Sequence, residues 1–461
     1  MAELDLVVIG AGPGGYIAAV RAAQLGMKVA VVEADKAGGV CGNWGCIPSK
    51  AILADATLAN DVKAAARTGI LKAAPDVDFG KVIDRSRQVA DRQAKGVEFL
   101  FKKNGIAMHQ GRGRLVPGGV VVTTKEGETR LEAPRVLLAT GSVERVLPGM
   151  EIDGQVVCTS REALAQRERP ASVVIIGGGA VGVEFAYAYR SFGAKVAVVE
   201  MAEQLLPGMD ADLGAELARQ FGRQGIEVFA KTKVTRVSRT DGGGHVGVDG
   251  AGGARTLDAA MVLVAVGRAP NVADLGLEEQ RIRIDRGHIV VGPTMETSVS
   301  GVWAIGDLVG PLLLAHAASE QGVIAVEAMA GLSPRPFEPE AVPMCVYCEP
   351  EVAAVGITEA QAKARGIDVK VGTFPLRALG KAMAIGRTDG FVKVVLDAKY
   401  DAILGVHMIG AAVTELIAEA GLARSLEATA DDVIATSHAH PTLAEAFREA
   451  TLAAVGRAVN I

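Results

Sequence analysis

The sequence predicts an α/β protein with two Rossmann-like dinucleotide-binding domains and a third, α+β unit at the C-terminal end. The main observation is an internal duplication, because residues 6–33 align without gaps on residues 173–200. Each copy has an apolar segment, a glycine-rich turn, a helix with small residues and a second apolar segment that ends in Glu33 or Glu200. This order is typical of a βαβ unit whose parallel strands are buried on both faces. Two copies therefore predict two nucleotide-binding domains.

Further apolar segments extend both domains. Three of these segments, residues 136–140, 261–267 and 301–307, end in glycine-containing turns. Such strand ends are where α/β sheets bind ligands. The glycine-rich stretch 241–254 keeps Val246 and Val248 in alternation between glycine clusters. This alternation predicts hairpin turns within the second domain rather than a linker.

From about Pro336 the pattern changes to alternating strands and alanine-rich helices, which indicates a separate α+β unit. The expected strands are residues 342–347, 391–396 and 403–409, and the expected helices are residues 414–426 and 443–457. We predict a first domain at 1–145 that is completed by 270–335, a second at 146–269 and the α+β unit at 336–461.

The composition excludes several classes of protein. The 461 residues include 48 Lys or Arg against 53 Asp or Glu, which gives a formal net charge of −5. Without a basic run, this balance argues against binding to nucleic acid or to an anionic membrane. The apolar run at 173–176 is far shorter than the roughly 20 residues of a membrane span. The acidic start has no signal or transit peptide pattern, so we expect a cytoplasmic protein.

The glycine spacing explains how each copy would bind a nucleotide. Gly10 makes a tight turn, Gly12 lets a pyrophosphate approach the backbone, and Gly15 lets the helix pack on its strand. The second copy repeats the pattern with Gly177, Gly179 and Gly182. The terminal acids would accept hydrogen bonds from ribose hydroxyls. A carboxylate at Glu200 repels a 2′-phosphate and no Arg follows in 201–206, which favours NAD over NADP.

Two dinucleotide sites suggest electron transfer between cofactors, and Cys41 and Cys46 lie just after the first unit. In a regular helix these residues would be roughly 8 Å apart, beyond the Cα separation of about 7 Å that a disulfide allows. The segment must distort to form a bridge, and Gly42 and Gly45 permit this. A strained, accessible bridge is easily reduced, as a redox catalyst requires. The alternative is a pair of buried cysteines that never bond.

The run from Gly38 to Lys50, GGVCGNWGCIPSK, resembles the active-site signature of the flavin-dependent pyridine nucleotide–disulfide oxidoreductases. The likeness covers essentially the whole chain. The segment from Ser437 to Phe447, SHAHPTLAEAF, resembles the members of that family that oxidise dihydrolipoamide. The resemblance implies oxidation of dihydrolipoamide to lipoamide, with FAD and NAD as cofactors.

The resemblance also implies a set of site residues. FAD would be held by Gly10, Gly12, Gly15, Glu33, Gly113, Thr140, Gly141, Ser142, Asp307, Leu313, Leu314, Ala315 and His316. NAD would be held by Gly177, Gly179, Gly182, Glu184, Glu200, Val234 and Gly267. Cys46 would exchange electrons with the flavin, while Cys41 would form the mixed disulfide with substrate. Lys50 would lie near the flavin ring with Glu184 as its partner, because an unpaired buried charge is costly.

His440 is the candidate base that takes a proton from the substrate dithiol and stabilises the thiolate of Cys41. Glu445 is its expected orienting carboxylate. Pro441 is expected to start the following helix and to keep His440 extended. His438 is expected to play a supporting role. The resemblance implies a homodimer in which the C-terminal domain of one subunit supplies this histidine to the other.

Some positions depart from the family pattern. Gly42 and Trp44 differ from the usual residues between the cysteines, and Ala317 stands where a lysine is common. These changes affect the expected rate and potential rather than the reaction type. Cys345 and Cys348 are expected to be structural, since residues three apart on a strand point to opposite faces and no further ligands complete a metal site.

The resemblance implies docking to the lipoyl domain of a dihydrolipoyl acyltransferase or to a glycine-cleavage lipoyl protein. Two alternatives remain: a reductase of the same family for glutathione-like or mercuric substrates, and a flavoprotein that binds nucleotides without turnover. Glu200 without a neighbouring Arg argues against the glutathione type. The His440 and Glu445 pair, and the absence of a C-terminal cysteine pair, argue against the mercuric type. The complete set of redox residues argues against a protein without turnover.

Overall fold

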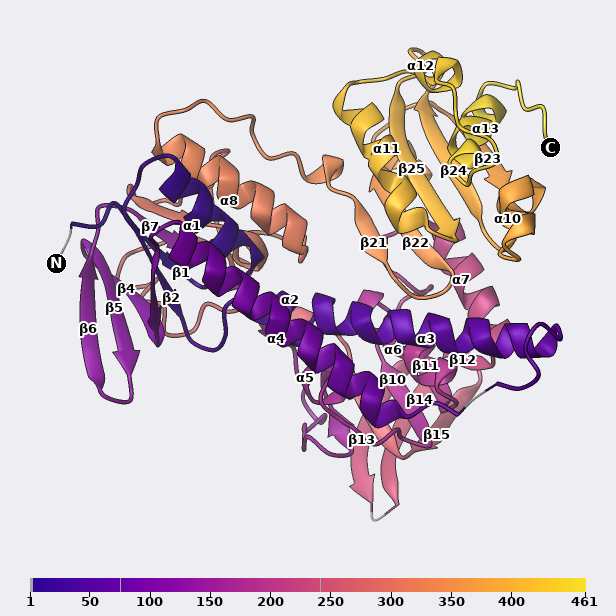
Figure 1. The fold of residues 1–461 in the computed structure, drawn as a ribbon, viewed down its shortest axis with the longest axis horizontal. Coiled ribbons are helices and arrows are strands. Elements are labelled where there is room, and N and C mark those ends of the chain that lie inside the picture. Colours follow the sequence, from indigo (N-terminus) through magenta and orange to yellow (C-terminus); the bar gives the residue numbers. More distant parts are fainter. Residues whose placement is uncertain (1–2, 75, 241) are drawn as a thin grey trace.

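The computed structural model describes residues 3–74, 76–240 and 242–461 (Figure 1). Its first part is a parallel sheet with strand order β20-β7-β1-β2-β3. The strands are β1 (Leu6–Ile9), β2 (Val29–Glu33), β3 (Ala107–Gln110), β7 (Val136–Leu138) and β20 (Val302–Ala304). Helices α1 (Pro13–Gln24) and α8 (Ala315–Met329) pack against each other beside this sheet. Because β20 and α8 come from late in the chain, they support the predicted split domain, whose boundaries stay a prediction.

A second parallel sheet repeats this arrangement, with strand order β12-β11-β10-β16-β9. Its strands are β9 (Val157–Cys158), β10 (Ser172–Ile176), β11 (Lys195–Val199), β12 (Ile226–Phe229) and β16 (Met261–Val264). Its helices are α5 (Ser160–Ala163), α6 (Ala180–Ser191) and α7 (Ala211–Gln224). Leu6 pairs with Val29 in the first copy, and Val173 pairs with Val196 at the same place in the second. The predicted duplication is confirmed.

Antiparallel strands complete both parts. The glycine-rich stretch forms hairpins between β13 (Lys233–Thr240), β14 (Gly243–Gly250) and β15 (Gly253–Ala259), as predicted, although Asp241 lies outside the described residues. A separate sheet contains β4 (Arg112–Val116), β5 (Gly119–Thr124) and β6 (Gly127–Glu132). The chain leaves the first part through β8 (Ser142–Glu144) and returns through its neighbour β17 (Arg268–Pro270). A short ribbon joins β18 (Ile284–Asp285) and β19 (His288–Ile289).

Two long helices cross the centre of the molecule (Figure 1). The short α2 (Gly39–Trp44) leads directly into α3 (Cys46–Arg67), and α4 (Phe79–Lys103) packs along α3. Helix α3 also packs on α6, where the Thr57 hydroxyl lies 3.0 Å from the Tyr187 hydroxyl. Helix α3 therefore connects the redox segment to the second sheet. Across the described ranges, no helix combines the length and apolar character that crossing a membrane requires.

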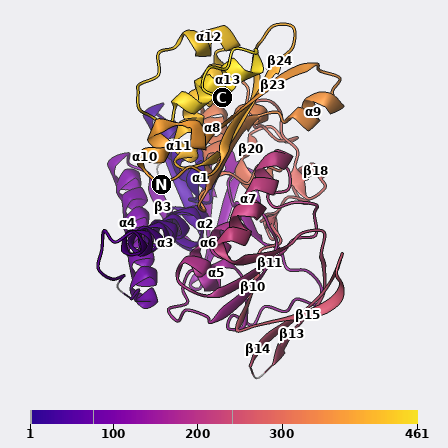
Figure 2. The same ribbon diagram turned by 90° about the vertical axis from the view of Figure 1, so that its right-hand side faces the viewer.

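The C-terminal part is an antiparallel sheet with strand order β21-β22-β25-β24-β23, covered by helices (Figure 2). Its strands are β21 (Met344–Val346), β22 (Glu351–Gly356), β23 (Val369–Pro375), β24 (Phe391–Asp397) and β25 (Ile403–Gly410). Its helices are α9 (Glu359–Ala364), α10 (Gly380–Ala384), α11 (Val413–Ser425), α12 (Ala430–Ala435) and α13 (Glu445–Ala454), and the chain also has 3₁₀ turns η1 (Gly306–Leu308), η2 (Pro339–Ala341) and η3 (Leu376–Ala378). The predicted α+β character is confirmed, with β22 and β23 added to the expected strands.

A buried ion cluster fixes the C-terminal part to the second sheet. The Lys393 ammonium of β24 lies 3.1 Å from Asp210 and 2.7 Å from Asp212, at the start of α7. Lys393 is only 4% exposed. Removal of the Lys393 ammonium would leave the buried Asp210 carboxylate without its cation, which is strongly destabilising.

The prediction that Pro441 starts the last helix is wrong, because α13 begins at Glu445. The Thr442 hydroxyl donates to the Ala439 carbonyl at 2.7 Å, and the Thr442 N–H donates to the Glu445 carboxylate at 2.9 Å. These hydrogen bonds hold the intervening residues as a turn. The histidine therefore lies on a loop ahead of the helix.

Candidate active site

The first glycine-rich loop joins β1 to α1. An added Cβ at Gly10 would lie 2.3 Å from the Ala139 carbonyl oxygen, and one at Gly15 would lie 2.0 Å from the Gly10 oxygen. Gly12 has nothing within 4 Å of an added Cβ. The fold therefore requires glycine at the first and third positions. The open space at Gly12, beside a helix N-terminus, fits a phosphate group.

The second loop, between β10 and α6, has the same construction. An added Cβ at Gly177 would lie 2.3 Å from the Ala265 oxygen, and one at Gly182 would lie 1.9 Å from the Gly177 oxygen. Gly179 again has nothing within 4 Å. The space that a second dinucleotide needs is therefore present.

The acid at the end of each copy fastens its own loop. A Glu33 oxygen accepts from the Ala11 N–H at 2.7 Å, and a Glu200 oxygen accepts from the Gly178 N–H at 2.6 Å. Burial raises the pKa of Glu33, and hydrogen bonds from the backbone oppose that increase. A carboxylate oxygen can accept more than one hydrogen bond, so both acids keep capacity for ribose hydroxyls.

The other predicted FAD residues gather largely at the carboxyl end of the first sheet, where ligands bind in such folds. Thr140 follows β7, and its hydroxyl donates to the Asn271 carbonyl at 2.7 Å. Ser142 forms a hydrogen bond with Asp307, which follows β20. Gly113 lies on β4, where an added Cβ would lie 2.9 Å from Ile9. Gly141 lies on the loop after β7. Leu313 and Leu314 lead into α8, and Ala315 and His316 open it.

The predicted NAD residues are less completely brought together. Gly177, Glu200 and Gly267 follow β10, β11 and β16 at one edge of the second sheet. Val234 lies on β13, packed against the apolar cluster under the hairpin sheet. Its contact with NAD stays a prediction.

The two redox cysteines lie on either side of a break between α2 and α3. Gly45 interrupts the helix with φ −150° and ψ −116°, and an added Cβ there would lie 3.4 Å from the Cys41 Cα. The distortion expected in this segment therefore occurs at Gly45. Gly42 lies within α2 and takes no part in the break. Both thiols are free and lie within hydrogen-bonding reach of each other.

The two thiols differ in acidity. The hydrogen bond from Cys41 is the main reason that the pKa of Cys46 is lowered to about 7. Burial acts in the opposite direction, and the Lys50 ammonium lowers the pKa further. The same hydrogen bond and burial raise the pKa of Cys41 above its usual value. Cys46 is therefore the thiol that becomes a thiolate first, which is the form that reacts.

The predicted partnership of Lys50 and Glu184 is present in the structure. The Lys50 ammonium lies 2.9 Å from each Glu184 oxygen. Lys50 lies on α3, one turn beyond Cys46, and Glu184 lies on α6 and is 6% exposed. The pair joins the redox helix to the second nucleotide domain.

Trp44 braces the redox helix. Its ring centroid lies 4.3 Å from the Arg87 guanidinium of α4 and 4.2 Å from the Arg161 guanidinium of α5. Its indole N–H donates to Asp35 at 3.0 Å. The bulk expected near the redox segment is therefore fixed by three charged side chains. Ala317 is fully buried in α8, and nothing in the structure explains why alanine stands there.

His440 and Glu445 form the predicted pair, with His440 Nδ1 2.9 Å from a Glu445 oxygen. The His440 side chain is 77% exposed. Burial alone would raise the pKa of Glu445. Hydrogen bonds from the Thr442 backbone and the His440 ring have the larger combined effect, so the pKa is lowered. In Figure 1 the loop between α12 and α13 lies at the outer end of the C-terminal part, away from α2. One chain alone does not bring His440 to Cys41.

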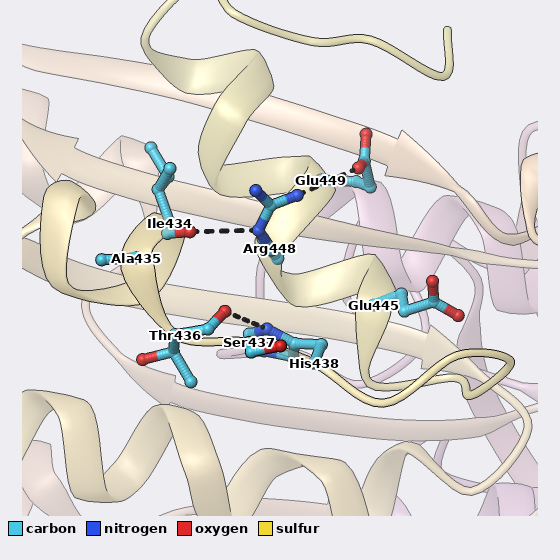
Figure 3. A pocket seen from close by; sticks show the side chains of 8 residues that line it. All are labelled: Ile434, Ala435, Thr436, Ser437, His438, Glu445, Arg448 and Glu449. Carbon is cyan, nitrogen blue, oxygen red and sulfur yellow. Dashed lines mark hydrogen bonds and ion pairs between the residues drawn. The ribbon is translucent and has the colours of Figure 1, made fainter.

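A polar cavity of about 340 Å³ adjoins Glu445 of this pair (Figure 3). Glu445 and Arg448 line it from α13, and Arg448 donates to the Ile434 carbonyl at 3.1 Å. His438 lies at the cavity edge with 4% of its side chain exposed, and its Nε2 is 2.8 Å from Glu419. This burial fits the supporting role expected for His438.

A family model described as pyridine nucleotide-disulphide oxidoreductase matches residues 4–322. The chain belongs to this family. The family's dimerisation domain matches residues 342–451. Members of this family use FAD and NAD. Two such nucleotides fit the open space at Gly12 and Gly179 and the acids Glu33 and Glu200.

Similar proteins cover the whole chain. A dihydrolipoyl dehydrogenase of Bacillus subtilis is 45% identical, with 99% of each protein covered. A dihydrolipoyl dehydrogenase of Mycobacterium leprae is 42% identical over 100% of both proteins. The crystal structure of LpdA from Mycobacterium tuberculosis has a TM-score of 0.90 at 29% identity, covering 97% of this chain and 99% of that one. The flavoprotein disulfide reductase RclA from Escherichia coli, as a Cu(II) complex, has a TM-score of 0.87 at 27% identity, covering 98% of this chain and 99% of that one.

Two tyrosines at the site were missed by the sequence reasoning. Burial and the neighbouring Cys41 raise the pKa of Tyr16, which lies on α1. Tyr347 follows β21, and its ring lies 4.4 Å from the Lys50 ammonium. Neither tyrosine has a motif of its own, because only the packing of distant elements brings it to the site.

Proposed function

We propose that this chain is an NAD-linked dihydrolipoyl dehydrogenase that oxidises dihydrolipoamide to lipoamide. The observation that carries the proposal is the thiol pair of Cys41 and Cys46 beside the Lys50–Glu184 ion pair, between two dinucleotide loops. Relatives with the name dihydrolipoyl dehydrogenase, 45% identical over 99% of the chain, support the same activity.

In the proposed reaction Cys41 and Cys46 begin as a disulfide. A substrate thiolate attacks the Cys41 sulfur, which forms a mixed disulfide and releases Cys46 as a thiolate. The second substrate thiol, after losing its proton, displaces Cys41 and leaves as lipoamide, so that the enzyme holds both electrons as a dithiol. Bound FAD supplies the two-electron relay from this dithiol to NAD, with one proton released for each NADH. The lowered pKa of Cys46 favours it as the flavin-facing thiol.

We assign FAD to the loop with Gly10, Gly12 and Gly15, and NAD to the loop with Gly177, Gly179 and Gly182. The first loop adjoins the redox helix, because the Gly38 N–H donates to the Ala11 carbonyl at 2.9 Å. The second loop opens α6, which carries Glu184. These contacts fit a path in which electrons pass from the thiols to FAD at the first loop and then to NAD at the second loop.

His440 acts in this proposal as the base for the substrate dithiol, held by Glu445. Because the His440 side chain is 77% exposed and its loop lies away from α2 in Figure 1, a second subunit supplies it in a homodimer. The dimerisation-domain match supports that arrangement. We further propose that the substrate is the lipoyl group of an acyltransferase or of a glycine-cleavage protein, and a cytoplasmic location stays a prediction from the sequence.

NAD reduction by dihydrolipoamide tests the proposal, with NADP and glutathione systems measured in parallel. We expect NAD-specific turnover that falls at least about a hundredfold in His440→Gln, as loss of a general base predicts. His245→Gln is the matched control, because His245 also pairs with a carboxylate, Asp258, but on the β14–β15 hairpin. Turnover with glutathione disulfide and NADPH instead would contradict the proposed substrate.

A further inference from the structure

The Lys50–Glu184 pair is contacted by a third part of the chain. Lys50 belongs to the redox helix, Glu184 to α6 of the second domain, and Tyr347 to the C-terminal part. The Tyr347 N–H donates to a Glu184 oxygen at 3.0 Å, and the Tyr347 ring lies 4.4 Å from the Lys50 ammonium. One residue therefore contacts both charges of the ion pair, through its backbone and through its ring.

The backbone of Tyr347 is held independently of Lys50. Tyr347 directly follows β21, whose residues Met344 to Val346 pair with β22. The Cys345 thiol of β21 neighbours the Tyr347 side chain. The sheet therefore holds the backbone that carries the ring, and the ring offers the flexible Lys50 side chain a surface to settle against.

Lys50 needs such a surface because its side chain is 33% exposed, whereas the Glu184 side chain is only 8% exposed. A lysine has a flexible stem and a compact charge, and water competes for it. The negative face of an aromatic ring attracts a cation and restricts where it settles. Glu184 fixes one side of the ammonium and the ring fixes another.

The place of this ammonium matters to Cys46. Cys41, Lys50 and Glu184 act on the pKa of the Cys46 thiol, and Cys345, Glu184 and Glu415 act on the pKa of the Tyr347 phenol. Lys50 lowers the pKa of Cys46, whereas Glu184 raises it. Movement of the ammonium away from the thiol would therefore leave the opposing carboxylate dominant.

We propose that Tyr347 is a positioning residue that holds the Lys50 ammonium beside Cys46 and so controls how readily Cys46 becomes a thiolate. The C-terminal part of the chain thereby acts on the redox centre through the Tyr347 ring, in addition to the role proposed for His440. This inference rests on the proposed role of Cys46 as the flavin-facing thiol.

The test uses the FAD-loaded protein with Cys41→Ser, in which Cys46 is the remaining redox thiol. A thiolate beside oxidised flavin gives a long-wavelength charge-transfer band, so its absorbance against pH reports the pKa of Cys46. We expect Tyr347→Leu to raise this pKa by about half a unit, roughly a threefold loss of thiolate near the midpoint. Tyr347→Phe keeps the ring and should titrate as the parent does.

Two controls separate the ring from general effects. Tyr400→Leu removes a comparable pair, since the Lys399 ammonium lies 4.5 Å from the exposed Tyr400 ring, and should leave the titration unchanged. Fluorinated phenylalanines at position 347 weaken the negative face of the ring at nearly constant shape. They should raise the pKa of Cys46 in order of fluorination even if Tyr347→Leu does not fold.

The outcomes distinguish this inference from the proposed function. No charge-transfer band in the Cys41→Ser parent would refute the role of Cys46 itself. A band whose pKa is the same with tyrosine, leucine and fluorinated rings would overturn the role of Tyr347 alone. An equal shift in Tyr347→Phe and Tyr347→Leu would also overturn it, because the hydroxyl and not the ring would then be responsible.

Discussion

The two dinucleotide loops have the same turn but different surroundings. An added Cβ at Gly14, after the first loop, would lie 2.9 Å from both the Ala318 carbonyl oxygen and an Ile305 methyl. The equivalent residue of the second copy is Val181, which is 41% exposed. An added Cβ at Gly39, the first residue of α2, would lie 2.6 Å from the Gly12 Cα. The first loop is thus covered by α8 and α2, while the second faces outward.

This difference shows how one βαβ unit serves two purposes. The glycines at the turn create space for a phosphate in both copies, and the residues around the turn decide how freely a nucleotide enters and leaves. Enclosure of the first loop suits a cofactor that stays bound through many turnovers. The open second loop, with Met201 74% exposed beside Glu200, suits a nucleotide that exchanges in each turnover.

The largest expected effect comes from substituting Gly14 and Val181, the equivalent residues that differ between the two loops. Gly14→Val should push α8 away from α1, because overpacking of this kind costs about 1–3 kcal/mol. FAD retention, measured as flavin absorbance after gel filtration, should fall roughly five- to hundredfold. Val181→Gly should leave both FAD content and turnover close to those of the parent. Equal FAD content in the two variants would remove the basis of the comparison.

A smaller effect is expected at the acid of the open loop. Glu200→Gln removes the charge that repels a 2′-phosphate, so the ratio of kcat/KM for NAD to that for NADP should fall about tenfold. Glu203→Gln is the matched control, since Glu203 is a neighbouring acid whose carboxylate pairs with Lys231 at 2.8 Å. A ratio that stays at the parental value in Glu200→Gln would show that another residue selects the cofactor.

The smallest effect concerns the acid of the enclosed loop. Burial raises the pKa of Glu33 above 4.5 in the folded chain. As pH rises from 4.5 towards that higher value, the unfolded chain releases the proton first, so the free energy of unfolding falls. Unfolding of the FAD-free protein across this range should show that fall. Glu33→Gln should lose this contribution, and an unchanged pH slope in the variant would contradict it.

Local patterns were sufficient to predict much of the fold. The duplication, the glycines at the turns and the acids at the strand ends all act within a few residues of one another, so the sequence displays them directly. Cysteine spacing and helix geometry conflict, which predicts a distortion between the cysteines but does not choose between Gly42 and Gly45. Lys50 and Glu184 were paired only through the resemblance to a family.

The remaining features depend on contacts between distant segments. Trp44 appeared only as added bulk, because Arg87, Arg161 and Asp35 come from three other elements. Tyr347 had no signal, since its ring matters only where β21 ends beside Lys50. Pro441 was placed in a helix by a local rule, but the side chains of Thr442 and Glu445 stabilise a turn there.

The most direct test of the proposed electron path follows the bound flavin in Cys46→Ser without oxygen. Dihydrolipoamide and NADH are added separately to the parent and to the variant, and the loss of flavin absorbance is recorded. We expect both reductants to bleach the flavin in the parent, whereas NADH alone bleaches it in the variant. Bleaching of the variant by dihydrolipoamide at the parental rate would show that electrons reach the flavin without Cys46.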